Sequence, residues 1–192
     1  SFLLTETLVG FLYSDGIDWE DESIMYMYST DQGQSWKQSV VKEPFVGLRF
    51  RKVDFLNDNF GYIIISGYRT MSAEGSWVFL TDDGGASWQE TENTEVTRLI
   101  YDGGFIDERT GFLSFGTINP DEPDVYLTED GGHSWNQAIF NIPNEYQNIF
   151  VSAEVPTKET DHLSVLVNQG PNGDYQGGKV KGKFISRDNG KT

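Results

Sequence analysis

The sequence predicts an all-β fold, a β-propeller of four-stranded antiparallel blades joined by tight turns. The pattern Ser/Thr-x-Asp-x-Gly-x-Ser/Thr-Trp occurs three times, and a fourth copy stops before the tryptophan. A run rich in apolar and β-branched residues precedes each copy, so each pattern joins two strands. The pattern aspartates lie 52, 47 and 58 residues apart, a spacing typical of four-stranded blades. No segment has a convincing helical periodicity.

Each position of the pattern has a physical role in a tight turn. The Asp carboxylate can accept backbone N–H groups, and a Gly two residues later tolerates a positive φ. The flanking hydroxyls can bond to the same turn. The Trp heads the next strand and can place its indole in the core beneath the turn. These structural residues are Asp31, Gly33, Trp36, Asp83, Gly85, Trp88, Asp130, Gly132, Trp135, Asp188 and Gly190.

A second repeated feature gives the strand order. Residues 55–62 and 105–112 both consist of an apolar strand end, a polar turn, and then Gly and an aromatic residue. In the first repeat we expect Gly10 and Phe11 to occupy the positions of this Gly and aromatic residue. We expect a single domain over 1–192, an incomplete arc of about three and a half to four blades. Further blades or a neighbouring chain would cover its open edges. The expected blades span about 1–41, 48–92, 97–140 and 147–192, the last incomplete.

The repeats resemble Asp-box, or BNR, repeats, known from sialidases, sortilin-type receptors, xyloglucanases and the photosystem II assembly-factor family. The order and spacing of the two repeated motifs resemble the assembly-factor family most, because residues 55–62 and 105–112 precede boxes of the form Thr-x-Asp-Gly-Gly-x-Ser-Trp. In these families the box is a hairpin turn between the third and fourth strands of a propeller blade, away from the central site. The resemblance implies the fold and leaves the function open.

Composition excludes several classes of partner. The chain has 30 acidic and 14 basic residues, a net charge of −16, which disfavours nucleic acid and anionic membrane surfaces. The chain contains no cysteine, so it has neither disulfides nor a thiolate metal site. No run of 18 apolar residues is present, so we expect no transmembrane segment. We expect no cofactor.

The loops from the second to the third strand of each blade are the candidate binding surface. If the family's topology holds, they lie on the face opposite the boxes, and irregular loops on a rigid scaffold often carry binding residues. Exposed aromatic rings could stack on a sugar while polar neighbours fix its hydroxyls. The alternative is that these loops are solvated connectors. The candidate residues are Asp15, Asp18, Trp19, Tyr68, Arg69, Asp121, Asp124, Asn172 and Tyr175.

Neither a metal site nor a catalytic residue is predicted. Residues 15–22 contain five carboxylates, but their spacing differs from that of an EF-hand loop. The sialidase pattern includes an Arg-Ile-Pro segment, and residues 48–51 lack its Ile-Pro. We therefore expect a non-catalytic binding or scaffold module of an exported bacterial protein, extracellular or in the cell envelope, with a glycan or protein ligand. The alternative is a fragment of a glycoside hydrolase of sialidase or xyloglucanase type.

Overall fold

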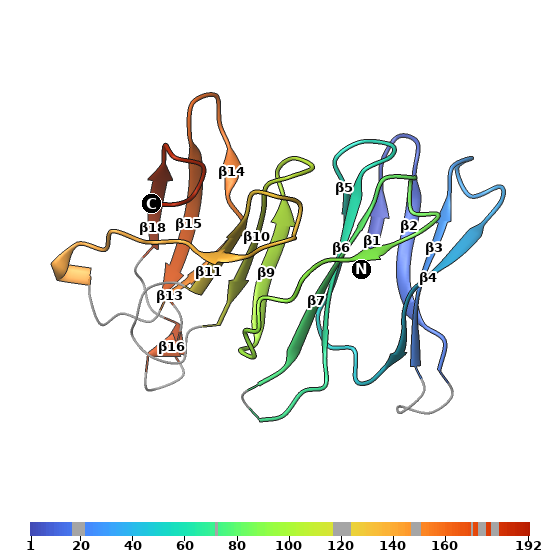
Figure 1. Ribbon diagram of the computed structural model, residues 1–192, viewed down its shortest axis with the longest axis horizontal. Helices are drawn as coiled ribbons and strands as arrows, with labels where there is room; N and C mark the ends of the chain where they lie inside the picture. The colour runs from blue at the N-terminus through green and yellow to red at the C-terminus, as the bar shows by residue number, and fades with distance from the viewer. Residues whose placement is uncertain are drawn as a thin grey trace. The chain divides into compact units, whose positions relative to one another are not determined.

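The computed structural model is all-β and consists of antiparallel sheets (Figure 1). The only helical segment in the described part of the chain is a 3-10 turn at Asn144–Tyr146, and no helix there could cross a membrane. The chain divides into two compact units, Ser1–Thr97 and Arg98–Thr192. The structure describes residues 1–16, 22–71, 73–116, 124–146, 151–169, 171–172, 176–177 and 181–192.

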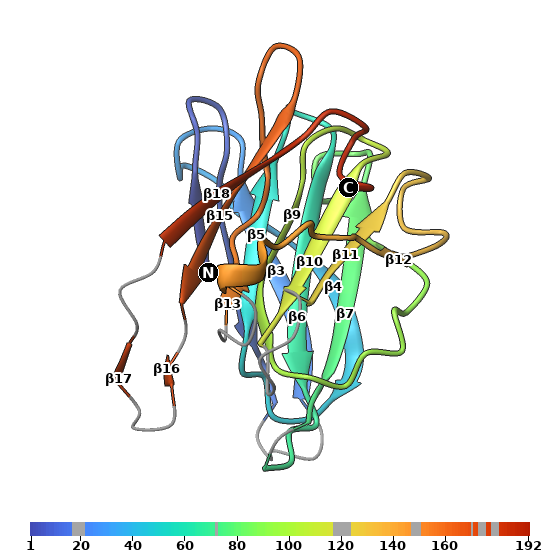
Figure 2. The ribbon, with the colours of Figure 1, turned by 90° about the vertical axis from the view of Figure 1, so that its left-hand side faces the viewer.

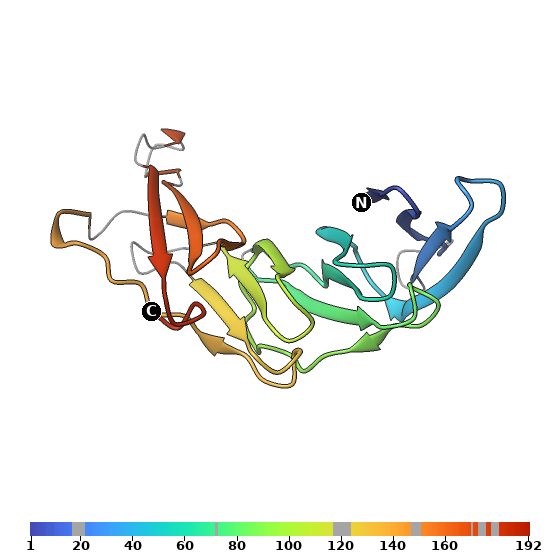
Figure 3. The ribbon, with the colours of Figure 1, turned by 90° about the horizontal axis from the view of Figure 1, so that it is seen from above.

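The first unit contains two four-stranded sheets. In both, the spatial order of the strands is their order in the sequence, so each sheet is a simple meander, as expected for a propeller blade. Seen from above, the blue first sheet and the cyan-to-green second sheet form separate layers of this unit (Figure 3). The strands are β1 (Phe2–Leu4), β2 (Val9–Ser14), β3 (Glu22–Ser29), β4 (Lys37–Phe45), β5 (Arg51–Phe55), β6 (Gly61–Gly67), β7 (Gly75–Thr81) and β8 (Gln89–Glu90).

The second unit repeats this plan. Its first sheet has the order β9-β10-β11-β12, with strands β9 (Ile100–Phe105), β10 (Gly111–Phe115), β11 (Asp124–Thr128) and β12 (Asn136–Gln137). Its other strands are β13 (Val151–Ala153), β14 (Thr157–Lys158), β15 (Leu163–Gln169), β16 (Pro171–Asn172), β17 (Gln176–Gly177) and β18 (Lys181–Ser186).

In the last sheet, β13 and β14 are two halves of one interrupted inner strand. Both pair with the same edge of β15, and β18 pairs with its other edge (Figure 1). The small hairpin of β16 and β17 lies beyond the end of β15 and β18 (Figure 2). Along the described residues, β18 has no strand partner at its second edge, so this sheet lacks the outer strand of the other three.

Strand register shows where the sequence alignment of the repeats was wrong by one residue. Gly61 pairs with Thr81, the first residue of its box, and Val9 pairs with Ser29 in the same way. Val9, rather than Gly10, therefore occupies the glycine position. In the turn before β2, the Thr5 hydroxyl accepts the N–H groups of Thr7 and Leu8. In the equivalent turn of the second sheet, the Asn57 side-chain oxygen accepts the N–H groups of Asn59 and Phe60. The first repeat was therefore aligned one residue out, because the turn pattern of the second and third repeats has Asn or Asp at the position that Thr5 occupies here.

The hydrophobic core lies between the sheets of each unit. Alternate residues of a strand point to opposite faces, so neighbouring sheets each contribute one face to a shared layer. In the first unit this layer contains the buried residues Leu12, Tyr26, Tyr28, Ile63, Ile65 and Phe79. In the second it contains Phe112, Val125, Leu127, Leu163, Val165 and Val167. These are four blade-like sheets packed face to face within their units.

Candidate functional site

The four boxes share one hydrogen-bond scheme. In the second box the Thr81 hydroxyl donates to Asp83 Oδ1 at 2.7 Å and accepts the Gly85 N–H at 3.0 Å. Ser87 donates its N–H to Asp83 Oδ1 at 2.9 Å and its hydroxyl to Oδ2 at 2.6 Å. The other three boxes repeat these bonds at 2.6–3.0 Å. The carboxylate is therefore the centre of the turn.

Two consecutive residues in each box adopt the left-handed conformation. In the first box these are Gln32, with φ of 58°, and Gly33, with φ of 87°. The other boxes place Gly-Gly, Gly-Gly and Asn-Gly there. The sequence prediction required a positive φ only at the second position, although the Gly or Asn at the first position in three boxes was a readable signal.

Hydrogen bonds lower the pKa of the box aspartates. The Ser87 hydroxyl and N–H, with the Thr81 hydroxyl, lower the pKa of Asp83 to about 2 against an opposing effect of burial. The equivalent bonds, with Ser35, Ser134 and Thr192 as the main donors, lower the pKa of the other three box aspartates to about 2. Each carboxylate is therefore ionised at neutral pH, and both of its oxygens accept hydrogen bonds from residues of its own turn.

The tryptophans of the first two boxes have different surroundings. Trp88 lies against the neighbouring sheet, where its ring packs edge-on to Tyr26 at 5.3 Å and its Nε1 donates to Ser39 Oγ at 3.1 Å. The Ser39 hydroxyl in turn donates to the Gly85 carbonyl at 2.7 Å. Trp36 is 44% exposed, because it stands on the face of the first sheet that is turned away from the second. The predicted indole position beneath the turn is thus found at Trp88 and differs at Trp36.

The loop end of the first unit presents an aromatic cluster. Tyr68 follows β6 at the end of the sheet opposite the box, as the pairing of Gly67 with Gly75 shows. Tyr68 is 47% exposed, and its ring lies 5.5 Å from the ring of buried Phe45 and 5.6 Å from that of Trp77.

Backbone and charge contacts hold the loop that carries Tyr68. Its N–H donates to the Val46 carbonyl at 2.9 Å, and its φ of 53° is unusual for a bulky residue. The same loop ends at Glu74, whose buried carboxylate forms a two-pronged ion pair with Arg49. Lys42 Nζ lies 5.6 Å from the Trp77 ring centroid. The loop that carries Tyr68 is therefore held by a backbone hydrogen bond and ends in an ion pair, and the neighbouring Trp77 ring lies near a charged side chain.

The other predicted binding residues fall into three groups. Arg69 and Asp15 are exposed, and Arg69 lies next to Tyr68. Asp124 is buried, forms an ion pair with Arg98 and accepts a bond from Gln137 Nε2, so its carboxylate is committed within the sheet. Asp18, Trp19, Asp121 and Tyr175 lie outside the described residues, and of Asn172 only the backbone is described.

The sequence prediction did not select Phe45 and Trp77 as members of this cluster. Both lie in strands, β4 and β7, whose composition is typical of the core. Over the residues that the structure describes, no group of three or more His, Asp and Glu side chains could hold a metal ion.

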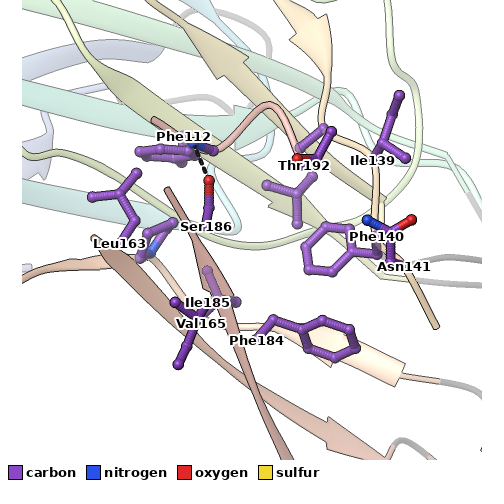
Figure 4. Close-up of a pocket in the computed structure, with 14 residues that line it drawn as sticks. Phe112, Ile139, Phe140, Asn141, Leu163, Val165, Phe184, Ile185, Ser186 and Thr192 are labelled. Atoms are coloured by element: carbon purple, nitrogen blue, oxygen red, sulfur yellow. Dashed lines mark hydrogen bonds between the residues drawn. The ribbon is translucent and has the colours of Figure 1, made fainter. Parts of the chain in front are cut away.

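A second candidate is a cavity of about 190 Å³ in the second unit, at the box end of its last sheet (Figure 4). Its wall is mostly apolar, and the rings of Phe140 and Phe184 meet there edge to face at 5.2 Å. Ser186 and Thr192, both from the fourth box, also line it.

Comparison with known proteins agrees with the box geometry. Residues 27–38 match the family model of the BNR/Asp-box repeat. A search of curated proteins gave no significant match. The matched segment contains the first box, and the hydrogen bonds of that box recur in the other three. The chain therefore contains a BNR/Asp-box repeat at residues 27–38 and three further boxes with the same hydrogen bonds, and each box closes one end of a blade-like antiparallel sheet.

Proposed function

We propose that the chain is a non-catalytic binding module of an exported bacterial protein and that it recognises a glycan through the loop face opposite the boxes. The observation that carries this proposal is the exposed Tyr68 ring on its aromatic base. A flat ring of this kind can stack on the C–H face of a sugar.

The backbone of Tyr68 supports a binding role. A bulky side chain in the left-handed region costs about 1–3 kcal/mol and persists only where its surroundings impose it. Here the Val46 carbonyl and the rings of Phe45 and Trp77 impose it, and the ring still points partly into solvent. A ring held in place by such contacts loses less entropy on binding than a freely rotating one.

A polar group that could select sugar hydroxyls follows Tyr68 in the sequence. The exposed guanidinium of Arg69 is next in sequence, and guanidinium groups donate several hydrogen bonds in a fixed geometry. By contrast, the box carboxylates at the other end of the sheets are saturated by their own turns. This division supports binding at the loops and a structural role for the boxes.

A glycan array combined with a hydrolysis screen tests the proposal. Tyr68→Asn removes the ring and keeps a residue type that tolerates a left-handed backbone. Trp36→Ala is the matched control, because Trp36 is a similarly exposed aromatic residue on the first box. We expect Tyr68→Asn to weaken binding of the best array glycan at least tenfold and Trp36→Ala to leave it unchanged.

Three results would contradict the proposal. The first is equal binding by Tyr68→Asn and the wild type. The second is turnover of a sialoside or glucan that a single carboxylate substitution abolishes, which would favour the glycoside hydrolase alternative. The third is capture of a protein ligand with no glycan bound, which would remove the glycan from the proposal.

A further inference from the structure

A cavity of the first unit lies between its two sheets, at the end that carries the boxes. Its volume is about 360 Å³, which is within the range typical of small-molecule sites. The first sheet contributes the turn before β2, the end of β3, part of the first box and the start of β4. The second sheet contributes the turn before β6 and part of the second box. The cavity is therefore separate from Tyr68, which lies at the other end of β6.

Tyr28 supplies the observation that points to a ligand. It is 6% exposed, it lines the cavity, and its hydroxyl has no hydrogen-bond partner among the described residues. Buried polar groups rarely lack a partner, because leaving them unpaired costs free energy. Burial and the nearby charge of Asp83 raise the pKa of Tyr28, so its hydroxyl keeps its proton at neutral pH and can donate. An acceptor on a bound ligand would satisfy this hydroxyl.

Two further donors belong to the same wall of the cavity. Lys37 pairs directly with Tyr28 across β3 and β4, and its ammonium group forms no ion pair within the described part of the chain. The hydroxyl of Thr30, in the first box, makes no hydrogen bond there either. One ammonium group and two hydroxyls together can bind a carboxylate, because all three donate and one of them is charged.

The wall from the second sheet carries the opposite charge. Asp58, in the turn before β6, accepts the Thr7 hydroxyl at Oδ1 at 2.9 Å, and its Oδ2 has no partner among the described residues. Asp83 lines this wall as well and is ionised, although its own turn uses its oxygens. Neither carboxylate forms an ion pair with Lys37, so opposite charges face one cavity without neutralising each other. This wall favours an ammonium group.

We infer that this cavity binds a small zwitterion with one carboxylate and one ammonium group, the class to which free amino acids belong. The ligand carboxylate faces the three donors of the first sheet, and its ammonium group faces Asp58. The two carboxylates of the cavity disfavour a simple anion, and Lys37 disfavours a simple cation. A sugar is disfavoured too, because the ring that lines the cavity belongs to Tyr28, which is buried and stacks on Tyr26 at 5.4 Å.

Isothermal titration calorimetry with the standard L-amino acids tests this inference. We expect saturable binding of at least one of them to the 192-residue chain. Lys37→Gln and Asp58→Asn should each raise the dissociation constant of the best binder about tenfold, because each removes one charge-assisted contact. The decarboxylated amine and the deaminated acid made from that amino acid each lack one charge, and wild type should bind each of them about tenfold more weakly.

The variants also test the orientation of the ligand. Lys37→Gln should bind the amine as tightly as the amino acid, because the partner of the ligand carboxylate is gone. Asp58→Asn should bind the deaminated acid as tightly as the amino acid, because the partner of the ammonium group is gone. The opposite pattern, or the same loss for both analogues in both variants, would overturn the assignment of the two walls.

Tyr28→Phe has a matched control in Tyr26→Phe. Both substitutions remove a buried hydroxyl that has no hydrogen-bond partner in the described part of the chain, but Tyr28 lines the cavity and Tyr26 does not. Tyr28→Phe should raise the dissociation constant about fivefold, the effect of one lost hydrogen bond, and Tyr26→Phe should leave it unchanged. Equal effects of the two substitutions would contradict a role for the Tyr28 hydroxyl.

Three results would overturn the inference as a whole. They are the lack of saturable binding by every standard amino acid, unchanged affinity in Lys37→Gln and Asp58→Asn, and binding of the amine by wild type as tightly as the amino acid. Tyr68→Asn should leave amino-acid binding unchanged, and Tyr28→Phe should leave glycan binding unchanged. Failure here is therefore distinct from failure of the proposed function.

Discussion

The substitution Gly85→Ala tests how a box joins two blades. Gly85 has a φ of 89°, and a Cβ atom built on it would lie 2.6 Å from Cε1 of Tyr26 in the neighbouring sheet. Tyr26 is fully buried, so its ring has little room to move. Gly33 is the matched control, because it holds the same box position with a φ of 87° and its Cβ would meet only the Trp36 ring at 3.7 Å.

The two substitutions differ only in the clash. A left-handed backbone costs an alanine about 1–2 kcal/mol, and this is the expected loss for Gly33→Ala. Gly85→Ala adds an overpacking cost of about 1–3 kcal/mol, so its total loss should be about 2–5 kcal/mol. Urea unfolding followed by circular dichroism measures both free energies of unfolding.

A double-mutant cycle isolates the contact with the neighbouring sheet. In a Tyr26→Leu background the ring is gone, so Gly85→Ala should cost only as much as Gly33→Ala does. Equal losses for Gly33→Ala and Gly85→Ala in the wild-type background would refute the packing of the box against Tyr26.

Further predictions concern buried groups and pH. Tyr26→Phe should leave the free energy of unfolding unchanged or raise it by about 1 kcal/mol in urea unfolding. The reason is that the Tyr26 hydroxyl is buried with no hydrogen-bond partner among the described residues. A fall in the free energy of unfolding by more than about 1 kcal/mol would show that the hydroxyl has a partner. The four box aspartates have folded pKa values of about 2, below their unfolded values, so their contribution to stability is present above about pH 4 and is lost as the pH falls toward 2. Unfolding curves at several pH values should show this decline, and stability that stays constant from pH 4 to pH 2 would contradict it. Asp130→Ala should cost about 1–3 kcal/mol in the same urea assay, since the turn donors lose their acceptor; an unchanged midpoint would show that the turn forms without it.

The fold could be predicted because its signals are local and repeated. The box fixes a turn by contacts among eight consecutive residues, so Asp83 and its partners were readable without any knowledge of packing. The strand that precedes a box followed from the apolar run before each copy of the pattern, as in β7 and β11. The alignment of Val9 was missed because a Thr5 hydroxyl replaces an Asn side chain in the preceding turn.

The candidate site was less predictable because it depends on contacts between strands. Tyr68 was selected as an exposed loop aromatic, but its support by Phe45 and Trp77 arises only when β4 and β7 come together. Asp124 has the sequence context of a loop carboxylate, yet it is paired with Arg98, 26 residues away. A single sequence does not reveal which charges become partners in the folded chain.

The most direct test of the account compares stability and affinity in two variants, with the best glycan from the array as the ligand. Asp83→Ala should lower the unfolding temperature and leave the dissociation constant within twofold of wild type. Tyr68→Asn should raise the dissociation constant at least tenfold and lower the unfolding temperature by only a few degrees, because the lost packing on Phe45 and Trp77 is partly offset by relief of a strained backbone. A tenfold loss of affinity in folded Asp83→Ala, with normal binding by Tyr68→Asn, would show that the ligand binds at the box face and would contradict the account.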